Sequence, residues 1–167
     1  MEYRPATTQD ADELARLFAD GIATYTAFAP PGWTGPSYEG EVTELKRLLP
    51  DERVWCFVAV EAGTAVGQVM ILPTAISRVP ADRPGLAHFR NLFVAESHWG
   101  TGLAVDLHRA AIQAARERGF TQMRLYTPGR HGRARRFYER EGWVAIGGEL
   151  DDAELGIPLI EYRYALT

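Results

Sequence analysis

The sequence predicts an α/β protein in which helices pack on a single mixed β-sheet. Apolar runs of strand length alternate with segments whose apolar residues recur at helical spacing, in the order β-α-α-β-β-β-α-β-α-β-β. Neither an internal repeat nor a low-complexity stretch divides the chain. With 167 residues, of which 46% are hydrophobic and 24% charged, we expect one domain over residues 1–167 with its own core.

The first half of the chain contains two helical segments and four strand-like segments. Thr7 and Asp10 form the Thr-x-x-Asp pattern of a helix start, and Leu14, Leu17 and Phe18 then fall on one helical face. The expected elements are a strand at 3–6, helices after 7 and at 42–49, a loop at 30–36, strands at 54–61, 65–72 and 88–94, a hairpin turn at 62–64 and a loop at 73–85.

The second half contains the most regular helix of the chain. Apolar residues repeat at helical spacing along 103–114, polar residues occupy the opposite face, and Gly119 follows the last turn as a helix stop. A strand at 123–127, a short helix at 133–141 and two strands at 143–150 and 159–166 complete the expected order.

Composition argues against several classes of function. The net charge of -4 disfavours a broad nucleic-acid surface, so no nucleic-acid partner is expected. Residues 1–5 lack the basic start of a signal peptide, and every uncharged run is too short to cross a bilayer. We therefore expect a cytoplasmic protein without a membrane partner.

Cys56 is the only cysteine. One thiol can form neither an internal disulfide nor a cysteine-based metal site, and no metal site is expected. Within the apolar run 55–60, Cys56 could be a nucleophile, but a small buried core residue is the favoured interpretation.

The candidate functional centre is a strand that runs into a glycine-containing turn and then a helix, at residues 92–104. The first turn of a helix has unpaired N–H groups and a positive dipole end, which suit a phosphate. Gly100 and Gly102 would let the backbone approach it closely. A tight turn that binds nothing is an equal alternative on these residues alone. A dinucleotide fingerprint is excluded because Val105 stands at its third glycine, and no P-loop pattern is present.

Two segments carry a family resemblance. Residues 99–104, Trp-Gly-Thr-Gly-Leu-Ala, follow the pattern Gln/Arg-x-x-Gly-x-Gly/Ala except at their first position. Residues 134–143, Ala-Arg-Arg-Phe-Tyr-Glu-Arg-Glu-Gly-Trp, follow Ala-x-x-Phe-Tyr-x-x-x-Gly-Phe/Trp. The chain thereby resembles the GNAT N-acetyltransferase superfamily over nearly its whole length. This resemblance implies the GNAT-like acyl-CoA N-acyltransferase fold, a central mixed sheet flanked by about four helices.

The resemblance implies acetyl-CoA (coenzyme A) as the cofactor. The strand before the glycine turn would hold the pantetheine arm, in a gap where it splays from its parallel neighbour, and the turn would hold the pyrophosphate. The implied cofactor-binding residues are Leu92, Phe93, Val94, Trp99, Gly100, Thr101, Gly102, Leu103, Ala104 and His131. Trp99 lacks the cation that the family usually has there, and His131 stands where an Asn is frequent. We expect weaker cofactor affinity but a retained site.

The resemblance also implies direct attack of a primary amine on the thioester. A backbone N–H of the splayed strand would face the thioester oxygen and stabilise its developing charge. Tyr138 matches the family's proton donor to the leaving thiolate, with simple packing as the alternative. His88 occupies the position of a Glu base in some relatives, and a general base or a satisfied sheet residue are both open. Weaker candidates for the base are Glu96 and Glu161.

Acceptor recognition in the family comes from two loops that correspond here to residues 25–36 and 151–158. The acceptor would be a small-molecule amine, an amino-acid derivative or a peptide N-terminus. A non-catalytic acyl-CoA-binding sensor is the alternative function, and the oligomeric state is open, a homodimer included. The arginines between 130 and 136 would contact cofactor phosphates or solvent, with Arg133 and Arg136 sharing a face away from Ala134 and Tyr138.

Overall fold

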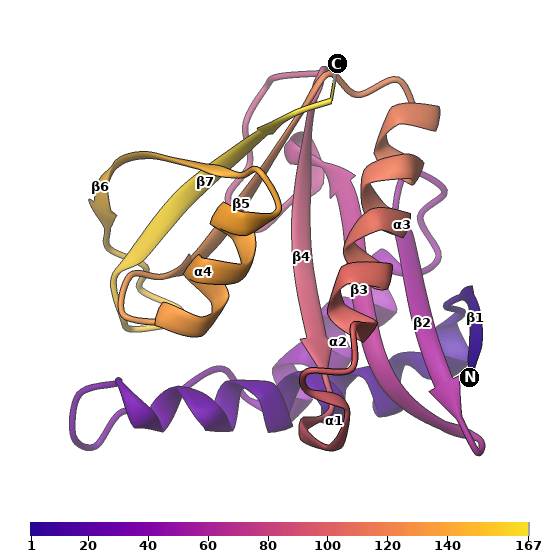
Figure 1. Cartoon of the computed structure of the whole chain (residues 1–167), viewed down its shortest axis with the longest axis horizontal. Helices are drawn as coiled ribbons and strands as arrows, with labels where there is room; N and C mark the ends of the chain where they lie inside the picture. Colours follow the sequence, from indigo (N-terminus) through magenta and orange to yellow (C-terminus); the bar gives the residue numbers. More distant parts are fainter. Residues whose placement is uncertain (167) are drawn as a thin grey trace.

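The computed structural model describes residues 1–166, so Thr167 of the expected domain lies outside the described residues. Its centre is a seven-stranded sheet in the order β1-β2-β3-β4-β5-β7-β6 (Figure 1). The strands are β1 (Glu2–Pro5), β2 (Trp55–Glu61), β3 (Thr64–Pro73), β4 (Leu86–Val94), β5 (Gln122–Pro128), β6 (Val144–Leu150) and β7 (Leu159–Ala165). The β4–β5 pair is parallel and the other neighbours are antiparallel, which confirms the mixed sheet.

Four α-helices of the described chain cover the two faces of this sheet. They are α1 (Ala11–Ala23), α2 (Tyr38–Leu48), α3 (Leu103–Glu117) and α4 (Gly132–Arg140). In Figure 1, α3 lies in front of the sheet and α2 behind it. The observed order of helices and strands is the one that the periodicity predicts.

Each face of the sheet has its own apolar core. Leu107 and Ala111 of α3 pack on one face with Phe89 and Trp143, and α1 and α2 cover the other face over Cys56, Val58 and Met70 in a separate cluster. Cys56 is 6% exposed, as expected of a core residue, and burial raises the pKa of its thiol to about 12. A thiol so protonated is a poor nucleophile, so the core interpretation of Cys56 is the one that the structure supports.

The start of the first helix follows the predicted capping pattern. The Thr7 N–H donates to Oδ2 of Asp10 at 2.7 Å, and the guanidinium of Arg4 donates to both carboxylate oxygens of Asp10. A short 3-10 turn, η1 (Thr8–Asp10), therefore precedes α1. Asp10 thus ties β1 to the helix that follows it.

The parallel strands β4 and β5 separate after three residue pairs. Leu86, Ala87 and His88 pair with residues 122–124, and the ladder stops there although both strands continue. The divergence is visible in Figure 1. The edge of β4 beyond His88 that faces β5 is therefore left without a strand partner, as the family resemblance implies.

No helix within residues 1–166 is both long enough and apolar enough to cross a membrane.

Candidate active site

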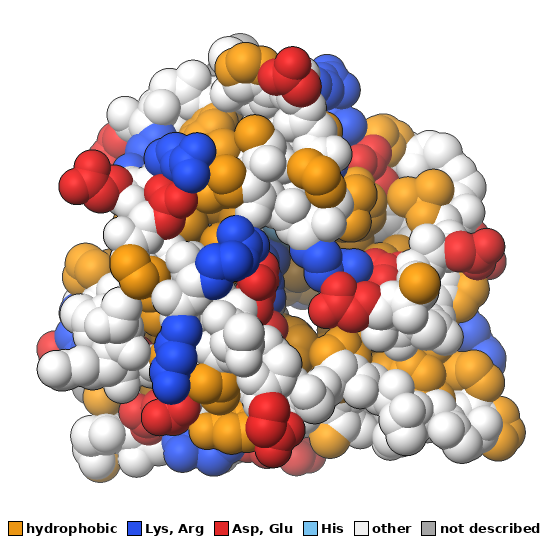
Figure 2. Space-filling model, turned by 180° about the vertical axis from the view of Figure 1, so that it is seen from behind, with side chains coloured by type: hydrophobic (Ala, Val, Ile, Leu, Met, Phe, Trp, Pro, Cys, Tyr) orange, Lys and Arg blue, Asp and Glu red, His pale blue; other side chains and the backbone are white. Residues whose placement is uncertain are grey.

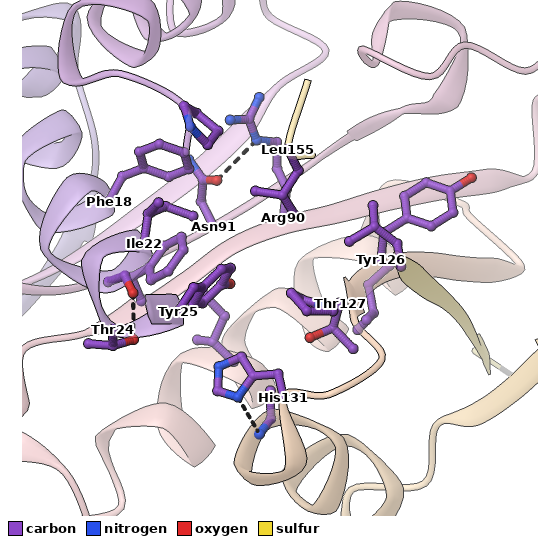
Figure 3. A pocket seen from close by; sticks show the side chains of 18 of the residues that line it. Phe18, Ile22, Thr24, Tyr25, Arg90, Asn91, Tyr126, Thr127, His131 and Leu155 are labelled. Atoms are coloured by element: carbon purple, nitrogen blue, oxygen red, sulfur yellow. Dashed lines mark hydrogen bonds between the residues drawn. The ribbon is translucent and has the colours of Figure 1, made fainter. Parts of the chain in front are cut away.

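A cavity of about 950 Å³ lies where β4 and β5 have separated. It is bordered by residues 88–94 of β4, residues 125–128 of β5, the end of α1, and the first turns of α4. Figure 3 shows Ile22 and Tyr25 on the α1 side of this cavity and Thr127 on the β5 side. Seen from behind in Figure 2, basic and acidic side chains gather around a hollow near the middle of the molecule. A large ligand could therefore reach between the two strands.

A bulge in β4 lies at the wall of the cavity. Arg90 pairs with Met70 and Phe93 with Gln68, so β4 has one residue more than β3 across this step. Asn91 adopts a φ of 57° in the bulge, in the left-handed region that Asn tolerates better than most residues. Such an extra residue interrupts the ladder and turns the strand, which helps to leave β4 backbone groups facing the cavity.

A buried carboxylate holds this bulge. Glu41 of α2 is 6% exposed, and it accepts from Nδ2 of Asn91 at 2.7 Å and from the guanidinium of Arg90 at 2.9 Å. Burial raises the pKa of Glu41 against the opposing effect of Arg90. No local sequence pattern predicts this cluster, because its contacts join residues about fifty positions apart in the chain.

The glycine turn before α3 has the geometry that a phosphate needs. Gly100 and Gly102 have φ values of 77° and 91°, and nothing lies within 4 Å of a Cβ built on either. The first hydrogen bond of the helix runs from Asp106 N–H to Gly102 C=O, so the N–H groups of 103–105 are the free donors of a first turn. Open space, free donors and a positive helix end together fit a phosphate group.

Trp99 lies between this turn and α4. Its indole N–H donates to the Val94 carbonyl at 2.9 Å, and the Arg133 guanidinium carbon lies 3.5 Å from the centre of its ring. Arg133 lines the cavity together with Ala134 and Tyr138. The prediction that Arg133 lies on the opposite face of the helix is therefore wrong: the first turn of α4 points its side chain back over Trp99. The Arg133 guanidinium thus places a cation beside Trp99, whose own side chain is uncharged.

Tyr138 lies on α4 and lines the same cavity. Its ring contacts Phe89, Trp143 and Tyr162, with ring centres 6.0–6.2 Å apart. Burial, with a smaller effect of Tyr25, raises the pKa of the Tyr138 phenol well above its usual value of 10. The phenol is therefore protonated at neutral pH and can act as a proton donor.

His88 is half-buried at the last paired position of β4. Arg124 donates from Nε to Nδ1 of His88 at 3.3 Å. Burial, reinforced by Arg124, lowers the pKa of His88 well below 6.5. A neutral imidazole whose Nδ1 already accepts a hydrogen bond from a cation is a weak proton acceptor.

His131 caps α4 and closes one side of the cavity. Its Nδ1 accepts from Ala134 N–H at 3.5 Å, and its ring lies 5.1 Å from the rings of Tyr25 and Phe28. Burial lowers the pKa of His131 to about 4, with a smaller effect of Arg133. At neutral pH it is an uncharged residue in the wall of the cavity.

Three loops meet at the outer end of the cavity. The Trp33 indole N–H donates to the Leu155 carbonyl at 2.7 Å, which joins the two loops predicted to bind the acceptor. Arg78, from the loop before β4, pairs with Asp152 at 2.6 Å and Glu154 at 3.1 Å. The loop at 73–85 was not predicted to take part, because nothing in its sequence indicates that it folds back onto residues 151–158.

The remaining candidates for the base lie apart from one another. Glu161 of β7 accepts from the Tyr126 hydroxyl at 3.2 Å and pairs with Arg163 at 3.5 Å. Glu96 begins the 3-10 turn η4 (Glu96–His98), which leads from β4 to the glycine turn. Neither residue is among those that line the cavity within the described part of the chain.

The fold and the motifs agree with a known family. The family model for the acetyltransferase (GNAT) family matches residues 22–143. The chain belongs to the GNAT acetyltransferase family. The matched region covers the splayed strands, the glycine turn and α4.

Individual relatives agree with the GNAT assignment. N-acetyltransferase family 8 member 2 of Rattus norvegicus is 31% identical over 113 residues, which are 66% of this chain and 49% of that protein. N-acetyltransferase 8 of Rattus norvegicus is 38% identical over 82 residues, 49% of this chain and 36% of that protein. The chain thus spans half or less of these curated relatives.

Solved structures share the whole fold. Ribosomal-protein-alanine N-acetyltransferase from Brucella melitensis superposes with a TM-score of 0.73 at 18% identity, over 99% of both chains. An N-acetyltransferase from Staphylococcus aureus Mu50 superposes with a TM-score of 0.75 at 15% identity, over 99% of this chain and 98% of the other. These likenesses establish the GNAT fold of the present chain, which confirms the predicted fold class.

Proposed function

We propose that this GNAT protein transfers an acetyl group from acetyl-CoA to a primary amine. The main support for this proposal is the continuity of the cavity. A single cavity runs from Trp99 and Ala104, beside the free N–H groups of α3, along the unpaired edge of β4 to the Tyr138 side chain. Bound acetyl-CoA would supply the thioester that the amine attacks.

The backbone of the chain would hold the cofactor at two places. The N–H groups of 103–105 and the glycine turn would bind the pyrophosphate, where Gly100 and Gly102 leave open space. The edge of β4 at Leu92, Phe93 and Val94 would orient the pantetheine arm. A β4 N–H directed at the thioester oxygen would stabilise the charge that develops there, by about 3–4 kcal/mol for a well-placed donor.

Tyr138 would donate a proton to the departing sulfur. Its raised pKa keeps the phenol protonated, and its side chain lines the cavity from α4. The base that accepts the amine proton is not assigned. His88 stays a prediction for that role, and its contact with Arg124 argues against direct proton acceptance.

The acceptor would enter from the end of the cavity that Arg78, Glu154 and Leu155 line, where the Leu155 carbonyl accepts the hydrogen bond from Trp33. We propose an amine on a small molecule, an amino-acid derivative or a peptide N-terminus. An acceptor ammonium would be attracted by the acidic side chains at this end. A cytoplasmic location, the absence of a nucleic-acid partner and a homodimer stay predictions. Exposed Val144 and Ile146 on the edge strand β6 are the candidate contact of such a dimer.

The test is calorimetric titration with acetyl-CoA, followed in the same samples by thiol release with a panel of amines. Binding together with thiol release for one amine would support the transferase proposal and begin to identify the acceptor. Binding without release for any amine would support the sensor alternative. Absence of binding at millimolar acetyl-CoA would refute the proposed cofactor.

A further inference from the structure

Trp99 and Arg133 form a stacked pair across the mouth of the cavity. Trp99 comes from the turn before α3 and Arg133 from the first turn of α4, so the pair joins elements on the two sides of the β4–β5 gap. Both residues line the cavity. The pair therefore lies on the path of any ligand that enters the gap from the glycine turn.

The indole is held in place before any ligand arrives. Its N–H donates to the Val94 carbonyl at 2.9 Å, which ties the ring to the last residue of β4. Trp99 is nevertheless 40% exposed. A large, partly exposed aromatic side chain that is fixed at its edge is a platform for a planar cation, and the Arg133 guanidinium lies over its ring.

The guanidinium keeps donors for a further partner. Within residues 1–166, Arg133 forms no ion pair with a carboxylate and donates no hydrogen bond, whereas Arg4, Arg47, Arg53, Arg78, Arg90 and Arg135 each pair with Asp or Glu. Glu96 acts on Arg133 only as a more distant charge. Stacking uses the face of the guanidinium and leaves its in-plane N–H groups free, and these match a phosphate or carboxylate.

The position of the pair favours a phosphate over a carboxylate as the ligand of the Arg133 guanidinium. Trp99 precedes the N-cap residue Gly102 by three residues, and Ala104 of the first turn lines the same cavity. The pair is thus at the same end of the cavity as the free backbone donors of α3. Backbone donors at a helix start and a guanidinium beside them together suit a dianionic group such as a pyrophosphate.

We propose that Arg133 is the side-chain ligand of the cofactor pyrophosphate and that Trp99 is the positioning residue that holds it there. This inference rests on the proposed use of acetyl-CoA. The chain thereby supplies from α4 the cation that residue 99 itself lacks. Cofactor affinity then depends on α4 as well as on the glycine turn, because the donor groups come from both sides of the gap.

The experiment compares wild type, Arg133→Ala, Arg133→Lys and the matched control Arg136→Ala by calorimetry. Arg136 is exposed on the same helix and does not line the cavity, so Arg136→Ala removes the same charge elsewhere. The ligands are coenzyme A, dephospho-coenzyme A, which keeps the pyrophosphate, and pantetheine, which has no phosphate. Circular dichroism and thermal unfolding show that each variant folds.

We expect Arg133→Ala to weaken both coenzyme A and dephospho-coenzyme A about tenfold, since a hydrogen bond to a charged group is lost. Arg133→Lys should recover only part of the loss, because an ammonium cannot stack as a guanidinium does. Pantetheine binding, or turnover with acetylpantetheine as donor, should be unchanged, as should all affinities of Arg136→Ala.

The role of Trp99 has its own measurement. Trp99→Ala should weaken coenzyme A binding, and the double variant with Arg133→Ala should be no weaker than Arg133→Ala alone, because the two residues act as one unit. Additive losses would show that Trp99 does not act through Arg133.

Other outcomes would overturn the proposal. Unchanged coenzyme A affinity in Arg133→Ala would remove Arg133 from the site. A loss for coenzyme A but not for dephospho-coenzyme A would move Arg133 to the 3′-phosphate, and an equal loss for pantetheine would indicate an effect on cavity shape. If wild type itself binds no coenzyme A, the proposed function fails instead.

Discussion

Trp143 donates its indole N–H to Nε2 of His108 at 2.9 Å in the core under α3. Both side chains are nearly inaccessible, at 2% and 3% exposed. The bond requires a lone pair on Nε2, so the imidazole is neutral with its proton on Nδ1. Nδ1 has no hydrogen-bond partner among residues 1–166, and the nearest carboxylate oxygen, on Glu141, is 3.9 Å away.

This histidine makes folding sensitive to mild acid. Burial lowers the pKa of His108 from 6.5 to about 4, so below pH 6.5 the unfolded chain binds a proton that the folded chain resists. Above pH 6.5 His108 does not reduce the free energy of unfolding. As the pH drops from 6.5 to 4, this one group lowers the free energy of unfolding by up to about 3 kcal/mol. Urea unfolding of wild type at pH 7 and pH 5 measures the fall. His108→Gln keeps an acceptor for Trp143 without titrating, and an undiminished pH dependence in that variant would contradict the assignment.

Tyr138→Phe should lower kcat by about 100-fold or more while the affinity for acetyl-CoA is retained, because the substitution removes only the hydroxyl that would donate the proton. Tyr164→Phe is the matched control, since Tyr164 does not line this cavity. Steady-state kinetics and calorimetry on the same preparations separate the two effects. Equal turnover in wild type and Tyr138→Phe would leave Tyr138 as a packing residue only.

Gly102→Glu should abolish acetyl-CoA binding, because the new side chain puts bulk and negative charge where the phosphate would lie. Gly119 at the other end of α3 is the matched control: its φ is 81°, and nothing lies within 4 Å of a Cβ built there. Both substitutions should cost about 1 kcal/mol of backbone strain. Calorimetry should show loss of binding only for Gly102→Glu. Binding by that variant would place the phosphate site elsewhere.

The contacts of His88 predict a small contribution to proton transfer. His88→Gln should lower kcat by less than about tenfold, since a positioned base contributes at least 100-fold. The pH dependence of kcat/KM, recorded for both proteins, is the second readout. A loss above 100-fold, with disappearance of an acid limb, would establish His88 as the base despite its bond to Arg124.

Trp33→Phe should raise the KM for the amine about fivefold without changing acetyl-CoA affinity, because it removes the hydrogen bond that joins the two acceptor loops. Trp55→Phe is the control, because Trp55 stacks on Phe57 away from the cavity. An unchanged KM would mean that the loops hold their positions without this bond. The amine identified by thiol release serves as substrate.

The order of the elements and the class of the fold follow from local patterns in the sequence. Periodicity locates α3 to the residue at its start, and Gly119 does follow its last turn with a φ of 81°. The family was predicted from the glycine spacing and from the Phe137-Tyr138 segment. The backbone conformation at Gly100 and Gly102 and the apolar face of a short helix both depend on the local sequence. These features depend on neighbours within about four residues along the chain, so the local sequence is enough to predict them.

Which side chains meet at the site depends on how distant segments of the chain pack together. Glu41 holds the bulge at Asn91 from fifty residues away, and Arg133 lies over Trp99 although helical spacing alone placed it on the other face. The sheet order brings β4, α1 and α4 around one gap, and the separation of β4 from β5 creates the space between them. Such contacts depend on chain crossings between distant segments, and the charge and burial that tune His88, His108 and Tyr138 exist only once those segments have packed together.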